Sequence, residues 1–218
     1  RKDWATYIRL HAHLDAPEEI SYQVQFEQEA ELFRNITGQL IDRQNQLQMA
    51  VVGFRDNGIL LRVSDAPEQA SEQLALQSVQ FMQELVSMTQ IDSQFSLKFG
   101  IGVASGPAIT KTLPLFGDAE FSDSLLHAFA LSLTAQELGT AVLADRNTYD
   151  VLCTSQGAHD IRILPDQSLR SIADKATVFE VLFNGGYEPR YIEAFNVAAW
   201  QYVNGKYREA LEFFMAQY

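Results

Sequence analysis

Residues 95–109, Phe-Ser-Leu-Lys-Phe-Gly-Ile-Gly-Val-Ala-Ser-Gly-Pro-Ala-Ile, decide how this chain is expected to fold. The run 95–103 is apolar and carries aromatic and β-branched residues, which is typical of a central strand. Ala104-Ser105-Gly106-Pro107 then predicts a loop, because small residues, glycine and proline cluster there. A buried strand of this kind needs partner strands beside it and helices on its faces, and the sequence on either side predicts both.

The sequence before this strand predicts a strand, a helix and a hairpin. Residues 4–14 alternate with period two, which favours a strand. One face then carries Trp4, Thr6, Ile8, Leu10, Ala12 and Leu14, and the other carries Tyr7, Arg9, His11 and His13. A broad apolar stripe predicts a helix over 18–46. Strands at 48–54 and 59–63 flank Arg55-Asp56-Asn57-Gly58, and Asn-Gly between apolar runs is a strong hairpin signal.

The remaining elements alternate between helix and strand. The pattern predicts helices over 67–89, 120–138 and 147–152, and strands over 141–145, 161–164 and 177–183. Gly139 predicts the end of the helix over 120–138, because glycine tolerates the left-handed cap conformation. This alternation predicts one α/β or α+β sandwich over residues 1–183.

A different pattern follows Phe183. Asn184-Gly185-Gly186 predicts a break, and 189–218 is helical around Asn204-Gly205, which predicts an αα-hairpin. Its Gly-x-Tyr-x-x-Ala-Leu run is similar to the middle of a tetratricopeptide repeat. We therefore expect a second unit over 184–218.

Composition excludes several classes of function. The 218 residues carry a formal net charge of −12, and such an acidic surface argues against nucleic-acid binding. A single cysteine, Cys153, excludes an internal disulfide and fits a cytoplasmic location. No apolar run is long enough to span a bilayer, and no signal peptide is present. Because the chain opens on Arg1-Lys2 and stops inside a helical pattern, we expect a piece of a longer protein, with membrane contact only through segments outside it.

Four segments in order resemble the class III adenylate/guanylate cyclase catalytic domain. FGIGVASGPAI (99–109) is similar to the family's strand-and-loop segment, and FGDAEFSDSLLHAFAL (116–131) to the stretch that runs into its dimer-facing helix. GTAVLADRNTYDVL (139–152) and LRSIADKATVFEVL (169–182) fit its later elements. The resemblance covers about residues 4–215 and includes the helical tail, which many bacterial cyclase domains share. It implies a ferredoxin-like α+β sandwich, with a mostly antiparallel sheet, helices on its faces and a C-terminal αα-hairpin.

The resemblance also implies where two metal-binding aspartates would lie. Cyclases hold two metal ions between aspartates on adjacent strands, and these ions activate the ribose hydroxyl. Alignment of YIRLHAHLD (7–15) with the family's F-x-D-I pattern puts His11 at the first position, while Asp56 occupies the second. Histidine is a poor ligand for a hard cation such as Mg²⁺. Of the two metal-binding carboxylates in the family pattern, only that of Asp56 is present.

The other catalytic positions implied by the resemblance also depart. In the family pattern G-D-A-V-N-x-A-x-R, an Asn orients the ribose and an Arg meets the developing charge on phosphate. Phe121 and Leu125 stand at these positions, and neither can donate a hydrogen bond. Val52 and Pro114 stand where a Lys and an Asp would read adenine. The late Lys-Gly becomes Arg170-Ser171, in which Arg170 can still meet a phosphate.

The sequence therefore predicts a catalytically inactive cyclase homology domain without a cofactor. It would act as a regulatory or scaffolding module that forms a homodimer or pairs with another protein domain. One alternative is an active cyclase that uses Asp56 together with Asp15 or Asp118. Another is a sensor that binds a nucleotide through Asp56, Asp118 and Arg170 without cleaving it.

Two further interpretations are weaker. His11 and His13 stand two residues apart, but without a Cys or acidic companion they indicate interface or surface residues rather than a metal pair. The 55–58 hairpin is also faintly similar to the Gly-Gly-Asp-Glu-Phe hairpin of diguanylate cyclases, although the glycines and the Glu are absent.

Overall fold

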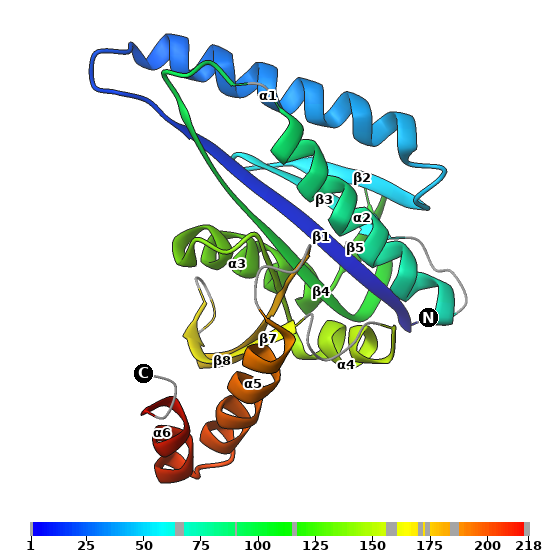
Figure 1. Cartoon of the computed structure of the whole chain (residues 1–218). Coiled ribbons are helices and arrows are strands. Elements are labelled where there is room, and N and C mark those ends of the chain that lie inside the picture. Colours follow the sequence, from blue (N-terminus) through cyan, green and yellow to red (C-terminus); the bar gives the residue numbers. More distant parts are fainter. Residues whose placement is uncertain are drawn as a thin grey trace.

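The structure is a computed structural model that describes residues 2–63, 68–89, 91–114, 117–155, 161–169, 172, 175–183 and 188–215. Within these residues eight strands form one sheet, in the order β2-β3-β1-β4-β6-β8-β7, and β5 pairs with β4 (Figure 1). Among the described strands only β4 and β6 run parallel. The strands are β1 (Lys2–Asp15), β2 (Met49–Phe54), β3 (Gly58–Val63), β4 (Ser96–Leu113), β5 (Gly117–Phe121), β6 (Val142–Ala144), β7 (Ile161–Ser168) and β8 (Lys175–Val181).

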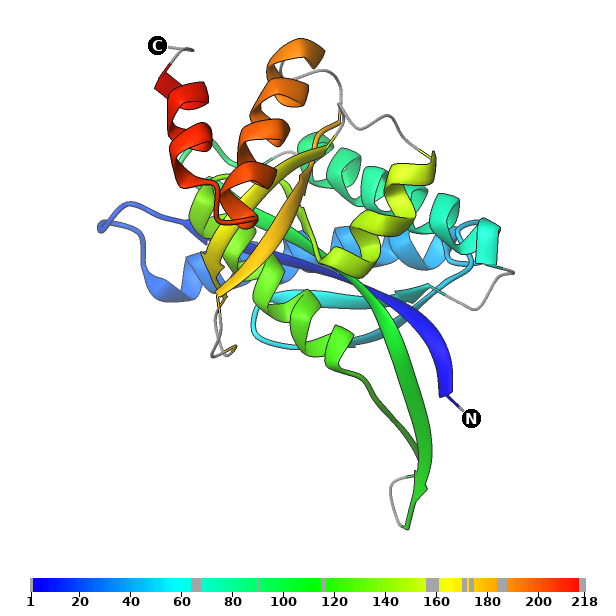
Figure 2. The same ribbon diagram turned by 90° about the horizontal axis from the view of Figure 1, so that it is seen from below.

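Helices cover both faces of this sheet. They are α1 (Tyr22–Arg43), α2 (Glu68–Met88), α3 (Asp123–Leu138), α4 (Arg146–Ser155), α5 (Pro189–Val203) and α6 (Tyr207–Met215). One core cluster joins α1, α2 and α4 to the sheet face that carries Ile8 and Leu10. A second cluster joins α3 to the opposite face, which carries Tyr7 and Ala5 (Figures 1 and 2). The expected α+β sandwich is confirmed.

Strand β4 is longer than the predicted strand over 95–103. Ala104-Ser105-Gly106-Pro107 is not a loop, because β1 pairs with β4 along the whole run from Ser96 opposite Asp15 to Ile109 opposite Lys2. The glycines of this strand serve close packing. A Cβ at Gly100 or Gly102 would lie within 3.0 Å of backbone atoms of α3, so only glycine lets the helix rest directly on the strand.

Two predicted helices begin later than the sequence suggested. The expected helix over 120–138 is wrong at its start, because Glu120 and Phe121 belong to β5 and pair with β4, and Ser122 caps α3. Likewise α1 starts at Tyr22 rather than at residue 18, after the N-cap Ser21, whose hydroxyl accepts a hydrogen bond from the Val24 backbone N–H.

The hairpin between β2 and β3 is confirmed. Asp56 and Asn57 both have positive φ, at 49° and 52°, as a tight two-residue turn between strands requires. The backbone N–H of Arg55 donates to the carbonyl of Gly58 over 3.0 Å and closes the turn.

The two C-terminal helices form the expected αα-hairpin, in which Gly205 has a φ of 77°. Helix α5 packs on β7, and its Ala198 and Ala199 are fully buried. Its Trp200 lies 6.4 Å from the Tyr149 ring of α4, and the guanidinium of Arg146 lies 4.9 Å from the centre of the Trp200 ring. The division between 1–183 and 184–218 stays a prediction. None of the described helices is long and apolar enough to cross a membrane.

Candidate functional site

The side chains of β1 that alternate from Tyr7 to His13 define one edge of the candidate site. Strand β1 lies between β3 and β4, so both of its edges are paired, and the two core clusters cover its two faces. Tyr7 and Arg9 are each only 1% exposed, although one is polar at its tip and the other is charged. His11 and His13 lie nearer the end of the strand and are half-buried. The predicted alternation is confirmed, and it places a buried arginine two residues before His11.

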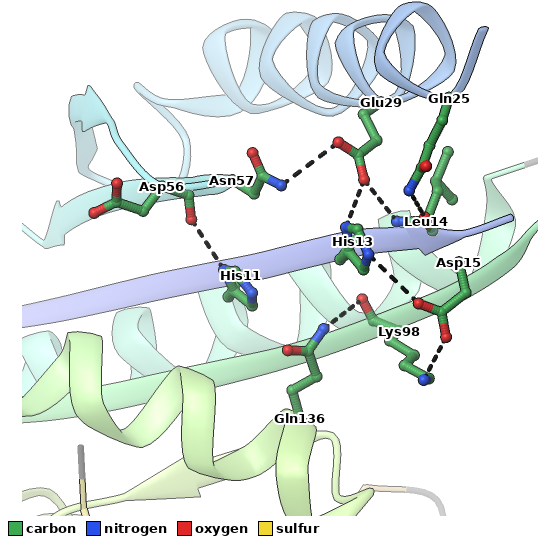
Figure 3. Close-up of polar contacts among 10 residues, drawn as sticks. All are labelled: His11, His13, Leu14, Asp15, Gln25, Glu29, Asp56, Asn57, Lys98 and Gln136. Carbon is green, nitrogen blue, oxygen red and sulfur yellow. Dashed lines mark hydrogen bonds and ion pairs between the residues drawn. The ribbon is translucent and has the colours of Figure 1, made fainter. Parts of the chain in front are cut away.

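His11 meets the β2–β3 hairpin through the backbone of Asp56. Strand pairing puts His11 opposite Gly58, and the imidazole Nδ1 lies 3.1 Å from the carbonyl oxygen of Asp56 (Figure 3). The Asp56 carboxylate points away from His11, is 72% exposed and pairs with Arg55 Nε at 3.2 Å. The structure therefore brings the two positions together but turns the one surviving carboxylate outward.

Arg9 fills the space beneath the same hairpin. Its Nη2 donates to the carbonyl oxygens of Arg55 and Asp56, at 3.1 and 2.9 Å. Its Nη1 donates to the Ser132 hydroxyl on α3 at 2.8 Å, and the guanidinium lies 4.1 Å from the centre of the Phe129 ring. Burial lowers the pKa of Arg9 to about 10, against the field of Asp56, which raises it. Arg9 therefore stays charged at neutral pH.

A carboxylate that the sequence analysis did not single out lies beside this group. Glu29 of α1 accepts from the Leu14 backbone N–H at 2.9 Å, lies 2.7 Å from His13 Nδ1 and accepts from the Asn57 amide at 3.5 Å (Figure 3). The sequence feature that could have identified Glu29 is its position on the buried stripe of α1, together with Leu32 and Ile36. An acid on an apolar helix face needs polar partners.

The expectation that the histidines lack an acidic companion is wrong for His13. Its Nδ1 faces Glu29, and its Nε2 lies 3.4 Å from Asp15, which also pairs with Lys98. The contacts of Asp15 and Glu29 are all made inside the chain, with cations, amides or backbone N–H groups. Both carboxylates therefore have partners within the chain.

These residues do not fit a pair of divalent cations. Hard cations such as Mg²⁺ take carboxylate and water oxygens, whereas this place offers the His11 imidazole and one outward carboxylate, that of Asp56. Across the part of the chain that the structure describes, no three His, Cys, Asp or Glu side chains gather in a way that could hold a metal ion.

The remaining predicted positions lie on four other segments. Phe121 ends β5 and is 51% exposed, and Leu125 is half-buried in the first turn of α3 against the second core cluster. Val52 forms the bulge of β2 and is 50% exposed. Pro114 follows β4 and is exposed. None of these four side chains can donate a hydrogen bond to a nucleotide.

Two ligand candidates, Asp118 and Arg170, lie partly or wholly outside the described residues. The backbone of Asp118 pairs with Thr112 in the β4–β5 ribbon, but its side chain is outside the described set. Arg170 and Ser171 lie outside the described residues altogether.

A histidine–aspartate pair stands at the start of α3 and α4. His127 Nδ1 lies 4.0 Å from one oxygen of Asp145, whose other oxygen caps α4 by accepting from the Thr148 backbone N–H at 2.8 Å. The neighbouring Asp145 carboxylate raises the pKa of His127, and the charge of Asp123 adds to this against the opposing effect of burial. Asp145 ends the predicted strand 141–145, two residues before the predicted helix, and an Asp just before a helix is the sequence signal for such a cap.

Solved nucleotide cyclase domains share this fold. The guanylate cyclase domain of RhGC from Catenaria anguillulae in complex with GTP aligns over 83% of this chain and 97% of its own, with a TM-score of 0.59 and 12% identity. The adenylyl cyclase CyaB from P. aeruginosa aligns over 85% and 98%, with a TM-score of 0.53 and 8% identity. The adenylate/guanylate cyclase/hydrolase from Silicibacter pomeroyi aligns over 84% and 99%, with a TM-score of 0.50 and 16% identity.

No family model matches the sequence, and neither does any curated protein. At identities this low, the likeness establishes the fold. The chain has the fold of the class III adenylyl/guanylyl cyclase catalytic domain, with a sequence that has diverged far from the solved examples.

Proposed function

We propose that this chain is a catalytically inactive cyclase-fold domain that acts as a regulatory module by pairing with itself or with another protein domain. The observation that carries the proposal is the contact between His11 and Asp56. The imidazole lies on the Asp56 backbone carbonyl at 3.1 Å, and the carboxylate faces solvent. A cyclase needs oxygen ligands for its metal ions at these two positions.

The exposed apolar side chains support a role in protein contact. Val52 and Phe121 stand where the family resemblance implies a Lys and an Asn, and both are about half-exposed, at 50% and 51%. Leu126, in the first turn of α3, is 61% exposed. Apolar side chains at positions that would otherwise read a polar nucleotide suit a protein surface better than a nucleotide.

The first test is turnover. The purified chain, incubated with ATP or GTP and Mn²⁺, is expected to form no cAMP or cGMP. Measurable product that disappears in Asp56→Ala would overturn the proposal and establish an active cyclase with unusual site residues.

The second test asks whether a nucleotide binds without reaction. A ligand at about 100 times its dissociation constant stabilises a protein by about 2.7 kcal/mol, which shows as a rise in Tm. We expect no rise with ATP, GTP, cAMP or cGMP. A reproducible rise without turnover would support a nucleotide sensor instead.

The third test addresses pairing. Light scattering coupled to size exclusion gives the mass of the wild type and of Val52→Lys and Phe121→Lys. A variant whose altered side chain lies in the pairing surface shifts the equilibrium toward monomer, and if neither variant does, self-pairing does not use these two positions. Val24→Lys is the matched control, because Val24 is 44% exposed on α1.

A further inference from the structure

The tip of the β2–β3 hairpin holds a strained backbone. Asp56 and Asn57 both adopt left-handed φ, which costs a residue with a side chain about 1–2 kcal/mol, although Asp and Asn tolerate it best. Such conformations persist only where the surroundings hold them. The surroundings here are the Arg9 guanidinium and the His11 imidazole, which both lie on the Asp56 carbonyl, at 2.9 and 3.1 Å.

Arg9 is a buried cation whose hydrogen-bond acceptors are all uncharged. Two backbone carbonyls and the Ser132 hydroxyl accept from it, and its Nε has no hydrogen-bond partner among the described residues. A buried charge costs several kcal/mol unless other groups stabilise it. The dipoles of the hairpin tip and the face of the Phe129 ring supply that stabilisation, so the cation and the turn depend on each other.

Gly58 supports this dependence independently. Among the described glycines only Gly139 and Gly205 have positive φ. The backbone conformation at position 58 therefore does not require glycine. A Cβ at Gly58 would instead lie 2.7–2.9 Å from the guanidinium atoms of Arg9. The residue is glycine because the arginine occupies that space.

We infer that Arg9 is the built-in cation of this site: it fixes the strained hairpin tip against α3, beside the two positions where the resemblance places the metal ligands of a cyclase. The inference rests on the proposed function for this comparison with a metal site, whereas the positioning role of Arg9 rests on its contacts alone. A planar guanidinium can hold two carbonyls and a hydroxyl at once, which the single ammonium of lysine does less well. The hairpin is thus organised before any ligand or partner arrives.

Hydrogen exchange followed by mass spectrometry tests the inference on the full chain. Arg9→Met removes the hydrogen bonds to the hairpin, and bonds to a charged group contribute about 1.5–3 kcal/mol each. We expect peptides that cover 54–59 to exchange about tenfold faster or more. Peptides from β7 and β8 should keep their rates, and Arg9→Lys should lie between. Arg162→Met, which removes another half-buried arginine, serves as control and should leave 54–59 unchanged.

Gly58→Ala keeps the test decisive if Arg9→Met does not fold. Its Cβ displaces the guanidinium, so the same peptides should exchange faster, whereas Gly53→Ala, whose Cβ would meet open space, should leave them unchanged. Unchanged exchange at 54–59 in the Arg9 or Gly58 variants, or equal acceleration across the whole sheet, would overturn the inference.

Adding Mn²⁺ to the wild-type chain provides a separate test. If Arg9 already supplies the cation, Mn²⁺ should not slow exchange at 54–59 in the wild type, and slowing by Mn²⁺ would contradict the comparison with a metal. Turnover of ATP or GTP would refute the proposed function but leave the exchange comparison of Arg9 variants intact, so the two failures are distinguishable.

Discussion

The side-chain amide of Asn196, on α5, donates to the backbone carbonyl of Ile161 over 2.7 Å, so a helix side chain takes the place of a neighbouring strand at the edge of β7. The amide oxygen of Asn196 also accepts from the backbone N–H of Ile163 at 2.9 Å. An unpaired strand edge is open to association with other chains. One asparagine thus satisfies two backbone groups of the edge strand and fastens the C-terminal helices to the sheet.

We expect Asn196→Ala to destabilise the chain by about 1–3 kcal/mol, because two partly buried backbone groups lose their partner. Urea unfolding measures the change. Asn35→Ala is the control, since Asn35 is exposed on α1, and it should change the free energy of unfolding by less than about 0.5 kcal/mol. Equal effects of the two variants would contradict the role of Asn196.

A fragment of residues 1–183 is expected to unfold at a lower temperature than the full chain and to associate at its exposed edge. The fragment would lose the Asn196 bonds, the buried Ala198 and Ala199, and the Trp200 contact with the Tyr149 ring. Calorimetry and light scattering on both chains measure these effects. A fragment as stable and as monomeric as the full chain would establish 184–218 as a separate unit.

Gly102→Ala is expected to destabilise the chain by about 1–3 kcal/mol or more, because the added methyl meets the backbone of α3 rather than a movable side chain. Gly38→Ala is the matched control on α1. Its Cβ would meet nothing within 4 Å, and alanine favours a helix interior over glycine by about 1 kcal/mol. The two glycine-to-alanine changes should therefore have opposite signs, as measured by thermal unfolding.

The order of the elements was readable from the sequence because each had a local signal. Period-two alternation predicted β1, and the Asn57-Gly58 dipeptide predicted the hairpin. The loop expected at 104–107 and the helix expected from residue 120 failed for one reason. Strand pairing overrode the local preference in both places. The pairing of β1 with β4 runs through Gly106-Pro107 to Ile109, and the pairing of β5 with β4 includes Glu120 and Phe121.

The candidate site was only partly predictable. The proximity of His11 and Asp56 followed from the resemblance, since both positions were assigned to adjacent strands. The roles of Arg9 and Glu29 did not, because each depends on contacts between segments far apart in sequence. Arg9 reaches Ser132 on α3, and Glu29 reaches Asn57 in the hairpin. Local sequence patterns do not predict which distant residues contact each other. They can only show that a charged residue stands at a position that periodicity predicts to be buried.

The His127–Asp145 pair is expected to make stability depend on pH. The pKa of His127 is raised in the folded chain above its ordinary value of 6.5, first through the neighbouring Asp145 carboxylate. The native state therefore binds the proton more tightly than the unfolded chain does. The stabilisation is fully present below the unfolded pKa and is lost as the pH rises through the higher, folded pKa.

His127→Gln should therefore cost stability at about pH 5.5, where the wild-type imidazole is charged in both states, and almost none at about pH 8.5. Because His127 is 44% exposed, solvent screens the pair, so the difference should be small and should shrink further with added salt. Urea unfolding at both pH values measures the first effect, and NMR titration of the imidazole gives the pKa directly. Asp145→Asn, which keeps a capping side chain for α4, should bring the pKa of His127 back toward its ordinary value. A His127 pKa that does not move in Asp145→Asn would show that Asp145 is not the cause of the shift.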